Sequence, residues 1–290
     1  MIVVVGGSGL LGRNVVYDLL LRGERVRVLV RDTERARALF GDQVDVRAGD
    51  VRQVNLHEEF DGASVIVSAM HGFLGGRGAG PYDIDHRGNA NLIDTASAIG
   101  ASVVLVSVIG ASADSALELF RAKHAAEQYL LASGVPWTIV RAGPFMETWL
   151  SILAQTVGRS GRPVIFGRGD QPIPFVSATD VAALVSRAAT GTTLRGQLVR
   201  LAGEPVSMTE LAHALQAARG WTGTVRHVPR PMLHLLAGLA RPVNPSFARK
   251  NRAAAAMDTN EWSTSTAETI NWLGRAPLSV SDVINRTEVR

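Results

Sequence analysis

A run of glycines directly after a short apolar segment constrains the fold of this chain most. Ile2–Val5 is β-branched throughout, and Gly6-Gly7-Ser8-Gly9-Leu10-Leu11-Gly12 follows it. The pattern predicts a strand, a tight turn and a helix over Leu10–Leu21. Gly6 permits the bend, Gly9 lets a ligand approach the backbone, and Gly12 lets the helix pack closely on the strand. The free N–H groups and the positive end of such a helix favour a bound anion, although a turn of this kind can also exist without a ligand.

Short β-branched runs alternate with longer helix-compatible stretches through the first half of the chain. This alternation is typical of right-handed βαβ units and predicts an α/β fold with a doubly wound parallel sheet of the Rossmann type. The predicted strands are Ile2–Val5, Arg25–Val30, Val44–Arg47, Ser64–Ser68, Ser102–Ser107, Trp137–Val140 and Gln197–Leu201. The predicted helices are Leu10–Leu21, Val54–Phe60, Tyr82–Ile99, Ser115–Ala132, Ala178–Ala189, Thr209–Ala218, Met232–Leu239 and Phe247–Met257.

The pattern loosens after Pro144, where glycines and prolines interrupt every apolar run up to Pro174. We therefore expect an NAD(P)-binding Rossmann domain over 1–144, to which 175–204 returns. Residues 145–174 and 205–290 are expected to form a smaller C-terminal substrate-binding cap. Within the cap, the apolar stretch Met232–Leu239 favours a buried helix over a membrane-facing or partner-facing one.

Composition excludes several classes of protein. With 290 residues, 46% hydrophobic and 19% charged, the chain has the composition of a globular protein. It contains no cysteine, which excludes disulfide scaffolds, thiolate nucleophiles and zinc-thiolate sites, and is compatible with the cytoplasm that we expect for it. The net charge of +4 comes from scattered arginines, so we expect no nucleic-acid partner. We expect neither a signal peptide nor stable membrane insertion, and leave a homodimer open.

The end of the second strand bears on which dinucleotide would bind. A carboxylate there accepts hydrogen bonds from a free ribose 2′-hydroxyl, whereas an arginine offers paired donors to a 2′-phosphate. Arg31 comes first after the strand, and Arg13 can converge on the same place. We therefore favour NADP(H) over NAD(H). The alternatives are that Arg31 is a solvated surface charge, and that Asp32 reads the ribose and selects NAD(H).

Several further motifs follow one another in sequence order. They are Gly6-x-x-Gly9-x-x-Gly12, Arg31, Gly49-Asp50-Val51, Asp85-x-x-Gly88-x-x-Asn91, Val106-Ser107, Arg141-Ala142-Gly143-Pro144 and Phe175-Val176-Ser177-Ala178-Thr179-Asp180-Val181. Together they resemble those of the short-chain dehydrogenase/reductase superfamily, and most closely its atypical NmrA-like and isoflavone-reductase-like branch. The resemblance covers nearly the whole chain and is strongest over residues 1–200.

The resemblance implies a cofactor across the carboxyl ends of the strands, where ligands of open α/β sheets bind. It assigns the diphosphate to the glycine turn, the 2′-phosphate to Arg31, the adenine edge to the segment after the third strand, and the nicotinamide side to later strands. The implied cofactor-binding residues are Gly6, Ser8, Gly9, Leu10, Leu11, Gly12, Arg31, Asp50, Val51, Ala69, Met70, Lys123, Gly143, Pro144 and Phe145.

The resemblance also implies a catalytic pair that this chain has only in part. Carbonyl-reducing relatives carry Tyr and Lys four residues apart on the fifth helix; here Lys123 stands at the second position and Leu119 at the first. Tyr129 lies too far along the same helix to replace the missing phenol. We expect Lys123 to bind the cofactor or assist proton transfer. The alternative is a surface pair with Glu127.

Two further residues are candidates for the chemistry. His71 follows the fourth strand and titrates near physiological pH, so it is a candidate acid or base, unless it merely occupies a glycine-rich loop. Ser107 ends the fifth strand, where the resemblance implies a substrate-orienting hydroxyl, unless it only caps the strand. Asp83, Asp85 and His86 lack a fourth ligand at suitable spacing, so we interpret them as capping and surface charge and expect no metal.

Together these features predict an NADPH-dependent reductase that transfers hydride to a small or medium apolar carbonyl, quinone or activated alkene. A conjugated acceptor can take its proton from a weaker donor than tyrosine, so Leu119 is tolerable. The alternative from another class is a non-catalytic NADP(H)-binding redox sensor or regulator. A third possibility, a sugar-nucleotide epimerase, is weakened by the missing tyrosine. The sequence does not define the substrate.

Overall fold

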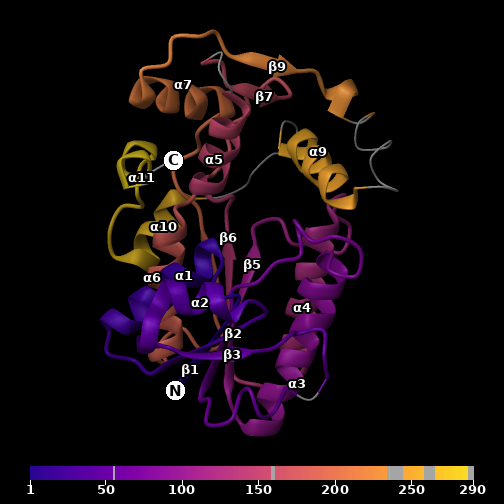
Figure 1. The fold of residues 1–290 in the computed structure, drawn as a ribbon, viewed down its shortest axis with the longest axis vertical. Coiled ribbons are helices and arrows are strands. Elements are labelled where there is room, and N and C mark those ends of the chain that lie inside the picture. Colours follow the sequence, from indigo (N-terminus) through magenta and orange to yellow (C-terminus); the bar gives the residue numbers. More distant parts are fainter. Residues whose placement is uncertain (55, 158–160, 234, 236–243, 258–264, 287–290) are drawn as a thin grey trace. The chain divides into compact units, whose positions relative to one another are not determined.

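The structure is a computed structural model that describes residues 1–54, 56–157, 161–233, 235, 244–257 and 265–286 (Figure 1). The chain divides into two compact units. The first comprises Met1–Arg141 and Ala178–Val199, and the second comprises Ala142–Ser177 and Arg200–Arg290. No helix among the described residues is both long and apolar enough to cross a membrane.

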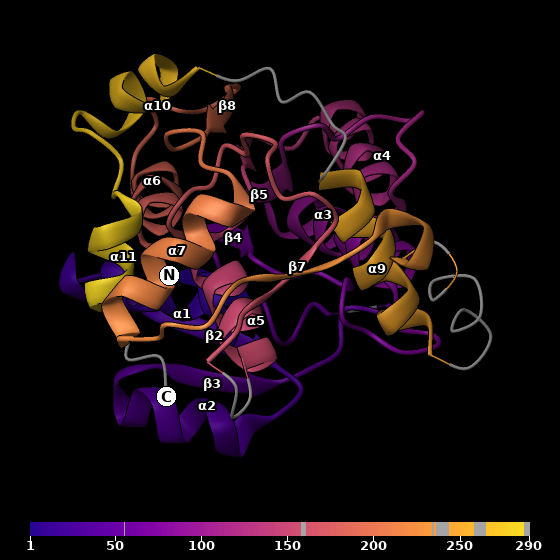
Figure 2. The same ribbon diagram turned by 90° about the horizontal axis from the view of Figure 1, so that it is seen from above.

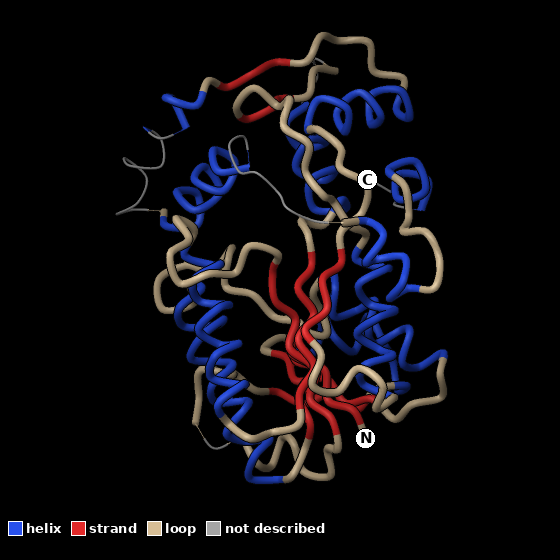
Figure 3. The backbone as a smooth tube through the Cα atoms, turned by 180° about the vertical axis from the view of Figure 1, so that it is seen from behind, coloured by secondary structure: helices blue, strands red, loops and turns tan. Residues whose placement is uncertain are grey.

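A seven-stranded sheet carries the first unit, with the strand order β3-β2-β1-β4-β5-β6-β8 (Figure 3). β1 lies between β2 and β4 and is parallel to both, with Val5 opposite Leu29 on one side and Ser68 on the other. The strands are β1 (Ile2–Val5), β2 (Val26–Val30), β3 (Asp45–Ala48), β4 (Val65–Ser68), β5 (Ser102–Val108), β6 (Trp137–Ala142) and β8 (Leu198–Leu201). The predicted α/β fold with a doubly wound parallel sheet is confirmed, and the strand ends differ from the predicted ones by a residue or two.

Helices cover both faces of this sheet (Figures 1 and 2). α1 packs on α6 on one face, and α3 packs on α4 on the other. The helices of the first unit are α1 (Leu10–Leu21), α2 (Thr33–Phe40), η1 (Gly41–Gln43), η2 (Tyr82–Gly88), α3 (Asn89–Ile99), α4 (Glu118–Ala132) and α6 (Ala178–Thr190). Covering both faces explains why the strands are β-branched on both sides: β1, β2 and β4 are buried at every position.

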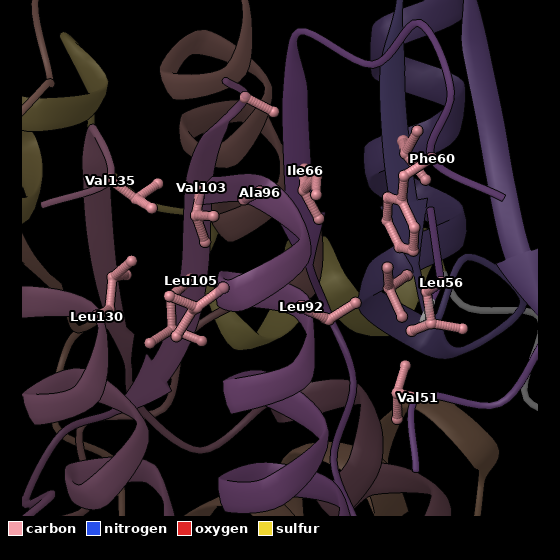
Figure 4. Close-up of a cluster of buried hydrophobic side chains, with 14 of the residues drawn as sticks. Val51, Leu56, Phe60, Ile66, Leu92, Ala96, Val103, Leu105, Leu130 and Val135 are labelled. Carbon is pink, nitrogen blue, oxygen red and sulfur yellow. The ribbon is translucent and has the colours of Figure 1, made fainter. Parts of the chain in front are cut away.

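The core beneath α3 and α4 joins side chains from strands and helices (Figure 4). Leu92 and Ala96 of α3 lie against Ile66 of β4 and Val103 of β5, and each of these four is at least nine-tenths buried. Their packing fastens α3 to the neighbouring strands β4 and β5.

The helix predicted over Val54–Phe60 is wrong. The described residues of this segment form turns, with the Phe60 N–H donating to the His57 carbonyl at 3.2 Å. Leu56 and Phe60 are fully buried, and their spacing of four residues produced the helical signal. A segment this short pays the whole cost of helix nucleation for few hydrogen bonds, and Gly62 with φ +72° ends it. Turns bury the same two side chains.

Two further differences concern helices. The single helix predicted over Tyr82–Ile99 consists of a π-helical segment, η2, followed by the α-helix α3. α2 was not predicted, although Asp32 caps it: the Asp32 carboxylate accepts a hydrogen bond from the Arg35 N–H at 2.9 Å. The predicted helix Met232–Leu239 lies largely outside the described residues.

The second unit has its own apolar core, which includes Leu150, Phe175 and Leu211. A two-stranded sheet pairs β7 with β9 in parallel. The elements of the second unit are α5 (Met146–Val157), β7 (Val164–Phe166), α7 (Met208–Arg219), β9 (Arg226–Val228), α9 (Pro245–Met257), α10 (Thr266–Leu273) and α11 (Val280–Arg286). The role of this unit as a substrate-binding cap stays a prediction.

Candidate functional site

The glycine turn between β1 and α1 is shaped so that side chains cannot replace its glycines. Gly6 has φ +82°, and a Cβ at Gly12 would lie 2.1 Å from the Gly6 carbonyl oxygen. A Cβ at Gly6 would meet the Ala69 carbonyl oxygen at 3.0 Å. The turn therefore packs tightly on α1 and lies directly beside the end of β4.

No side chain in the described part of the chain hydrogen-bonds to the N-terminus of α1. Gly9 is the N-cap residue, no side chain caps the helix, and its first turn contains no acidic residue. The first N–H groups of a helix need acceptors from outside the helix, and the helix dipole favours an anion there. Ser8 and Gly9 are not buried, so the geometry suits the diphosphate that the sequence predicts at Gly6–Gly12.

Arg31 and Asp32 take different roles at the end of β2. Arg31 is exposed. Asp32 is engaged by its own helix, because its Oδ1 accepts the Arg35 N–H. That carboxylate is therefore committed to capping α2, which speaks against the alternative in which Asp32 reads a ribose.

Asp50 and Val51 follow β3. The Asp50 carboxylate forms an ion pair with Arg52, whose Nε lies 2.9 Å from Oδ1, and this hydrogen bond is the main cause that lowers the pKa of Asp50. Arg52 also donates to the Gly78 carbonyl at 2.8 Å. The Val51 carbonyl accepts from Asn91 Nδ2 at 2.8 Å, which ties this segment to α3. The structure does not test whether Asp50 and Val51 contact adenine.

Lys123 is buried, and its ammonium group is fully engaged. It forms an ion pair with Asp85, with 3.0 Å between Nζ and Oδ1, and donates to the carbonyls of Met70 and Val106, each at 2.9 Å. Two hydrogen bonds and one ion pair therefore hold the ammonium group. The alternative of a surface pair with Glu127 is wrong, because Glu127 pairs with Arg141 instead.

The interpretation of Asp85 as a surface charge is also wrong. Asp85 is fully buried, and besides Lys123 it binds the Gly72 N–H through Oδ2 at 2.7 Å. The π-helical turn of η2 directs Asp85 inward, and Asn89 Nδ2 donates to its carbonyl at 2.7 Å. Sequence reasoning missed Asp85 and Asn89 as site residues. The available signal for Asp85 was its place at the start of the motif Asp85-x-x-Gly88-x-x-Asn91.

His71 follows Met70 at the end of β4 and keeps an exposed surface. None of the hydrogen bonds among the described residues involves its ring. Desolvation by the surrounding protein lowers the pKa of His71 below its ordinary value, while Asp85 acts to raise it and Lys123 to lower it further. His71 is thus an available imidazole next to the buried ion pair.

Ser107 lies near the carboxyl end of β5, directly after the Val106 carbonyl that accepts from Lys123. Its side chain is buried, and its Oγ has no hydrogen-bond partner among the described residues. Buried hydroxyls are normally satisfied, so an unpartnered one at this edge of the sheet fits a group that hydrogen-bonds to a bound ligand.

Tyr129 is not available to replace the missing phenol at Leu119. Its hydroxyl donates to Asp94 Oδ1 of α3 at 2.7 Å, and this hydrogen bond raises the pKa of Tyr129. No group of three or more His, Asp or Glu side chains in the described ranges is arranged to hold a metal ion.

Gly143, Pro144 and Phe145 belong to the second unit. The Pro144 carbonyl accepts from the Val176 N–H at 3.0 Å, and a Cβ at Gly143 would lie 2.3 Å from the Pro174 carbonyl oxygen. These three residues therefore pair closely with the segment 174–176. Whether they border a nicotinamide stays a prediction.

Among solved structures, the fold is similar to that of a triphenylmethane reductase from Citrobacter sp. complexed with NADP(H). The TM-score is 0.80 at 20% identity, and the match covers 99% of each chain. It is also similar to an NADPH-dependent quinone oxidoreductase from Escherichia coli complexed with NADPH, with a TM-score of 0.77 at 20% identity, covering 98% of this chain and 99% of the other. At these identities the likeness shows the fold.

Sequence relatives are more informative about family. An NAD(P)H azoreductase from Xenophilus azovorans is 31% identical over 222 residues, which cover 76% of this chain and 74% of that protein. Quinone oxidoreductase 2 of Escherichia coli strain K12 is 25% identical over 228 residues, covering 76% and 75% of the two chains. The profile of the NmrA-like family matches residues 1–270. With its glycine turn, its parallel sheet and this match, the chain belongs to the NmrA-like family.

Proposed function

We propose that this chain is an NADPH-dependent reductase that delivers hydride to a small or medium apolar carbonyl, quinone or activated alkene. The observation that carries the proposal is the glycine turn: it excludes a side chain at Gly12 and leads into a helix with no side-chain cap. A diphosphate is the group that such an N-terminus binds best. Relatives named as an azoreductase and a quinone oxidoreductase support the reaction class.

The residues present fit the cofactor. Gly6, Ser8, Gly9, Leu10, Leu11 and Gly12 would hold the diphosphate, Asp50 and Val51 the adenine edge, and Ala69 and Met70 the ribose near the nicotinamide. When bound, NADPH supplies a hydride, that is, two electrons and one hydrogen nucleus. The unpartnered Ser107 Oγ would donate a hydrogen bond to the acceptor oxygen and orient it. Gly143, Pro144 and Phe145 of the second unit would border the nicotinamide.

The preference for NADPH over NADH is assigned to Arg31. Its guanidinium is exposed after β2, while the neighbouring Asp32 is occupied as a helix cap. Replacing Arg31 by Ala removes donors to the 2′-phosphate, so the ratio of NADH to NADPH dissociation constants should fall by at least about 10-fold. Titration calorimetry measures both constants. Arg35→Ala, at an exposed arginine on the helix α2 that follows Arg31, is the matched control, and an unchanged ratio in Arg31→Ala would reject the assignment.

Leu119 favours a second candidate, an NADP(H)-binding redox sensor that performs no hydride transfer. Mixing the chain with NADPH and a panel of quinones, enones and aldehydes separates the two, with the absorbance of reduced nicotinamide as the readout. We expect turnover with conjugated acceptors. Tight NADPH binding without oxidation on any acceptor would reject the reductase and support the sensor. Interconversion of nucleotide sugars without net oxidation of the cofactor, followed by chromatography, would instead support an epimerase.

A further inference from the structure

The buried Lys123–Asp85 ion pair holds the peptide units on both sides of His71. Lys123 Nζ donates to the Met70 carbonyl, which belongs to the peptide unit preceding His71. Asp85 Oδ2 accepts from the Gly72 N–H, which belongs to the peptide unit following His71. The backbone at His71 is therefore fastened at both ends, while its side chain remains exposed.

The same ion pair is supported by a hydrogen-bonded network inside the first unit. Ser68 Oγ donates to Asn89 Oδ1, and Asn89 Nδ2 donates to the Asp85 carbonyl, both at 2.7 Å. The side chains of this network and of the ion pair are all buried: Ser68, Asn89, Asp85 and Lys123. Replacing a buried ion pair by apolar groups often costs nothing in stability, so stability alone does not explain one placed here. The contacts of the ion pair instead fix the backbone just after β4 and link it to the neighbouring strand β5.

That place lies next to the glycine turn. β1 and β4 are adjacent parallel strands, and the Gly6 backbone closely approaches the Ala69 carbonyl, two residues before His71. An imidazole at this edge of the sheet is within the region where an acceptor would be reduced. The charged groups that act on its ring are Asp85 of η2 and Lys123 of α4.

We propose that His71 donates the proton to the reduced acceptor, and that Asp85 and Lys123 are positioning residues that aim it. This inference rests on the proposed reductase function. A quinone gains the hydride with its two electrons, and a quinone oxygen takes a proton from the His71 imidazolium as that N–H bond breaks. The products are a hydroquinone, the oxidised dinucleotide and a neutral imidazole, which regains its proton from water because His71 keeps an exposed surface. Lys123 acts through the peptide backbone.

Two electron acceptors distinguish proton transfer from hydride transfer. A benzoquinone requires both a hydride and a proton, whereas a cationic triarylmethane dye becomes neutral on gaining a hydride alone. With NADPH, His71→Gln should lower the quinone rate by about 100-fold and leave the dye rate nearly unchanged. His57→Gln, an exposed histidine of the same unit, is the matched control and should change neither rate. An unchanged quinone rate in His71→Gln, or an equal fall with both acceptors, overturns the proposal.

The positioning role needs a variant that folds. A single substitution would leave an unpaired buried charge, so the test uses the double variant Asp85→Asn with Lys123→Met. The ratio of quinone to dye rates should fall by at least about 10-fold, and amide hydrogen exchange at Gly72, followed by NMR, should accelerate. The control is the double variant Glu127→Gln with Arg141→Met. It removes a second ion pair, between Glu127 of α4 and Arg141 of β6, whose hydrogen bonds do not involve residues 70–72. Equal ratios in the two double variants, or unchanged exchange at Gly72, overturn the positioning role.

The pH dependence provides a further check. The imidazolium donates only below its pKa, so the quinone rate should fall as pH rises through the lowered pKa of His71, and His71→Gln should lose this limb. The rate with the dye should not show this fall with pH, even in the unaltered chain. If the unaltered chain oxidises NADPH with neither acceptor, the reductase function fails. If it oxidises NADPH and His71→Gln retains the quinone rate, only the present inference fails.

Discussion

The N-termini of α1 and α2 follow neighbouring parallel strands but are completed in opposite ways. α2 is capped by its own chain, because the Asp32 carboxylate accepts the Arg35 N–H. α1 begins at Gly9 with no side-chain cap and no acidic residue in its first turn. In both helices, the first backbone N–H groups require acceptors from outside the helix. The difference shows that α1 keeps its first N–H groups available, whereas α2 satisfies one of them internally.

The glycines of the turn explain how α1 keeps its first N–H groups available. A cap side chain at Gly9 is much less obstructed than one at Gly12: the residue has φ −78°, and a Cβ there would lie 3.3 Å from the Gly6 oxygen, a tight contact that a shift of a few tenths of an ångström relieves. Gly12 is different, because a Cβ would overlap backbone atoms of the turn. The absence of a cap is therefore a matter of residue choice at Gly9, and the tight turn is a steric requirement at Gly12. Substitutions can separate the two.

Replacing Gly12 by Ala should have the largest effect. The added Cβ would lie 2.1 Å from the Gly6 oxygen and 2.7 Å from the Gly6 carbonyl carbon, so the turn must open. We expect a loss of about 3 kcal/mol in the free energy of unfolding and no measurable NADPH binding. Urea denaturation and calorimetry measure these. Gly191→Ala, at the end of α6, is the control; near-normal NADPH binding by Gly12→Ala would contradict the tight turn as a phosphate site.

Replacing Gly9 by Asp should turn the α1 terminus into one like that of α2. The carboxylate would cap the helix and place a negative charge where the diphosphate is proposed to bind. The free protein should gain up to about 1 kcal/mol in unfolding free energy, while NADPH affinity falls by about 100-fold. Thermal unfolding without ligand and calorimetry with NADPH report the two effects.

Gly9→Ala carries the same Cβ without the charge and is the matched control for Gly9→Asp. It should retain most of the NADPH affinity. Equal losses of affinity in the two variants would mean that the Cβ, not the carboxylate, is responsible, and would contradict the proposed anion site.

Replacing Asp32 by Ala should have the smallest effect, and only on stability. Loss of the cap lowers the free energy of unfolding by about 1 kcal/mol, and Asp32→Asn should recover most of it. The ratio of NADPH to NADH affinity should not change, because the carboxylate serves α2. A clear shift of that ratio toward NADPH in Asp32→Ala would show that Asp32 reads the ribose after all.

The elements whose signals are local were predicted well. The strand Ile2–Val5, the glycine turn and the helix Leu10–Leu21 match the structure residue for residue. The segment Val54–Phe60 failed because its two apolar residues satisfy helical spacing and are buried equally well by turns. α2 was overlooked although Asp32 is a suitable N-cap residue, since its carboxylate was considered only as a ribose ligand.

The candidate site shows the same limit. His71 became a candidate because it follows a strand, and Ser107 because it ends one where the resemblance implies a hydroxyl; the carboxyl ends of parallel strands meet at one edge. The partners of Lys123 were not identified: Asp85 was taken for a surface charge and Glu127 for an alternative partner. Finding Asp85 requires the π-helical register of η2 and its packing against α4.

By itself, the sequence determined the parallel sheet and the glycine turn, because the alternation of strands and helices and the steric need for glycine are set by neighbouring residues. Tertiary structure alone decided that Lys123 is buried, that Asp85 is its counter-ion and that the two hold the backbone around His71. The reason is physical: a buried charge must find its partner across space, and residues distant along the chain supply it.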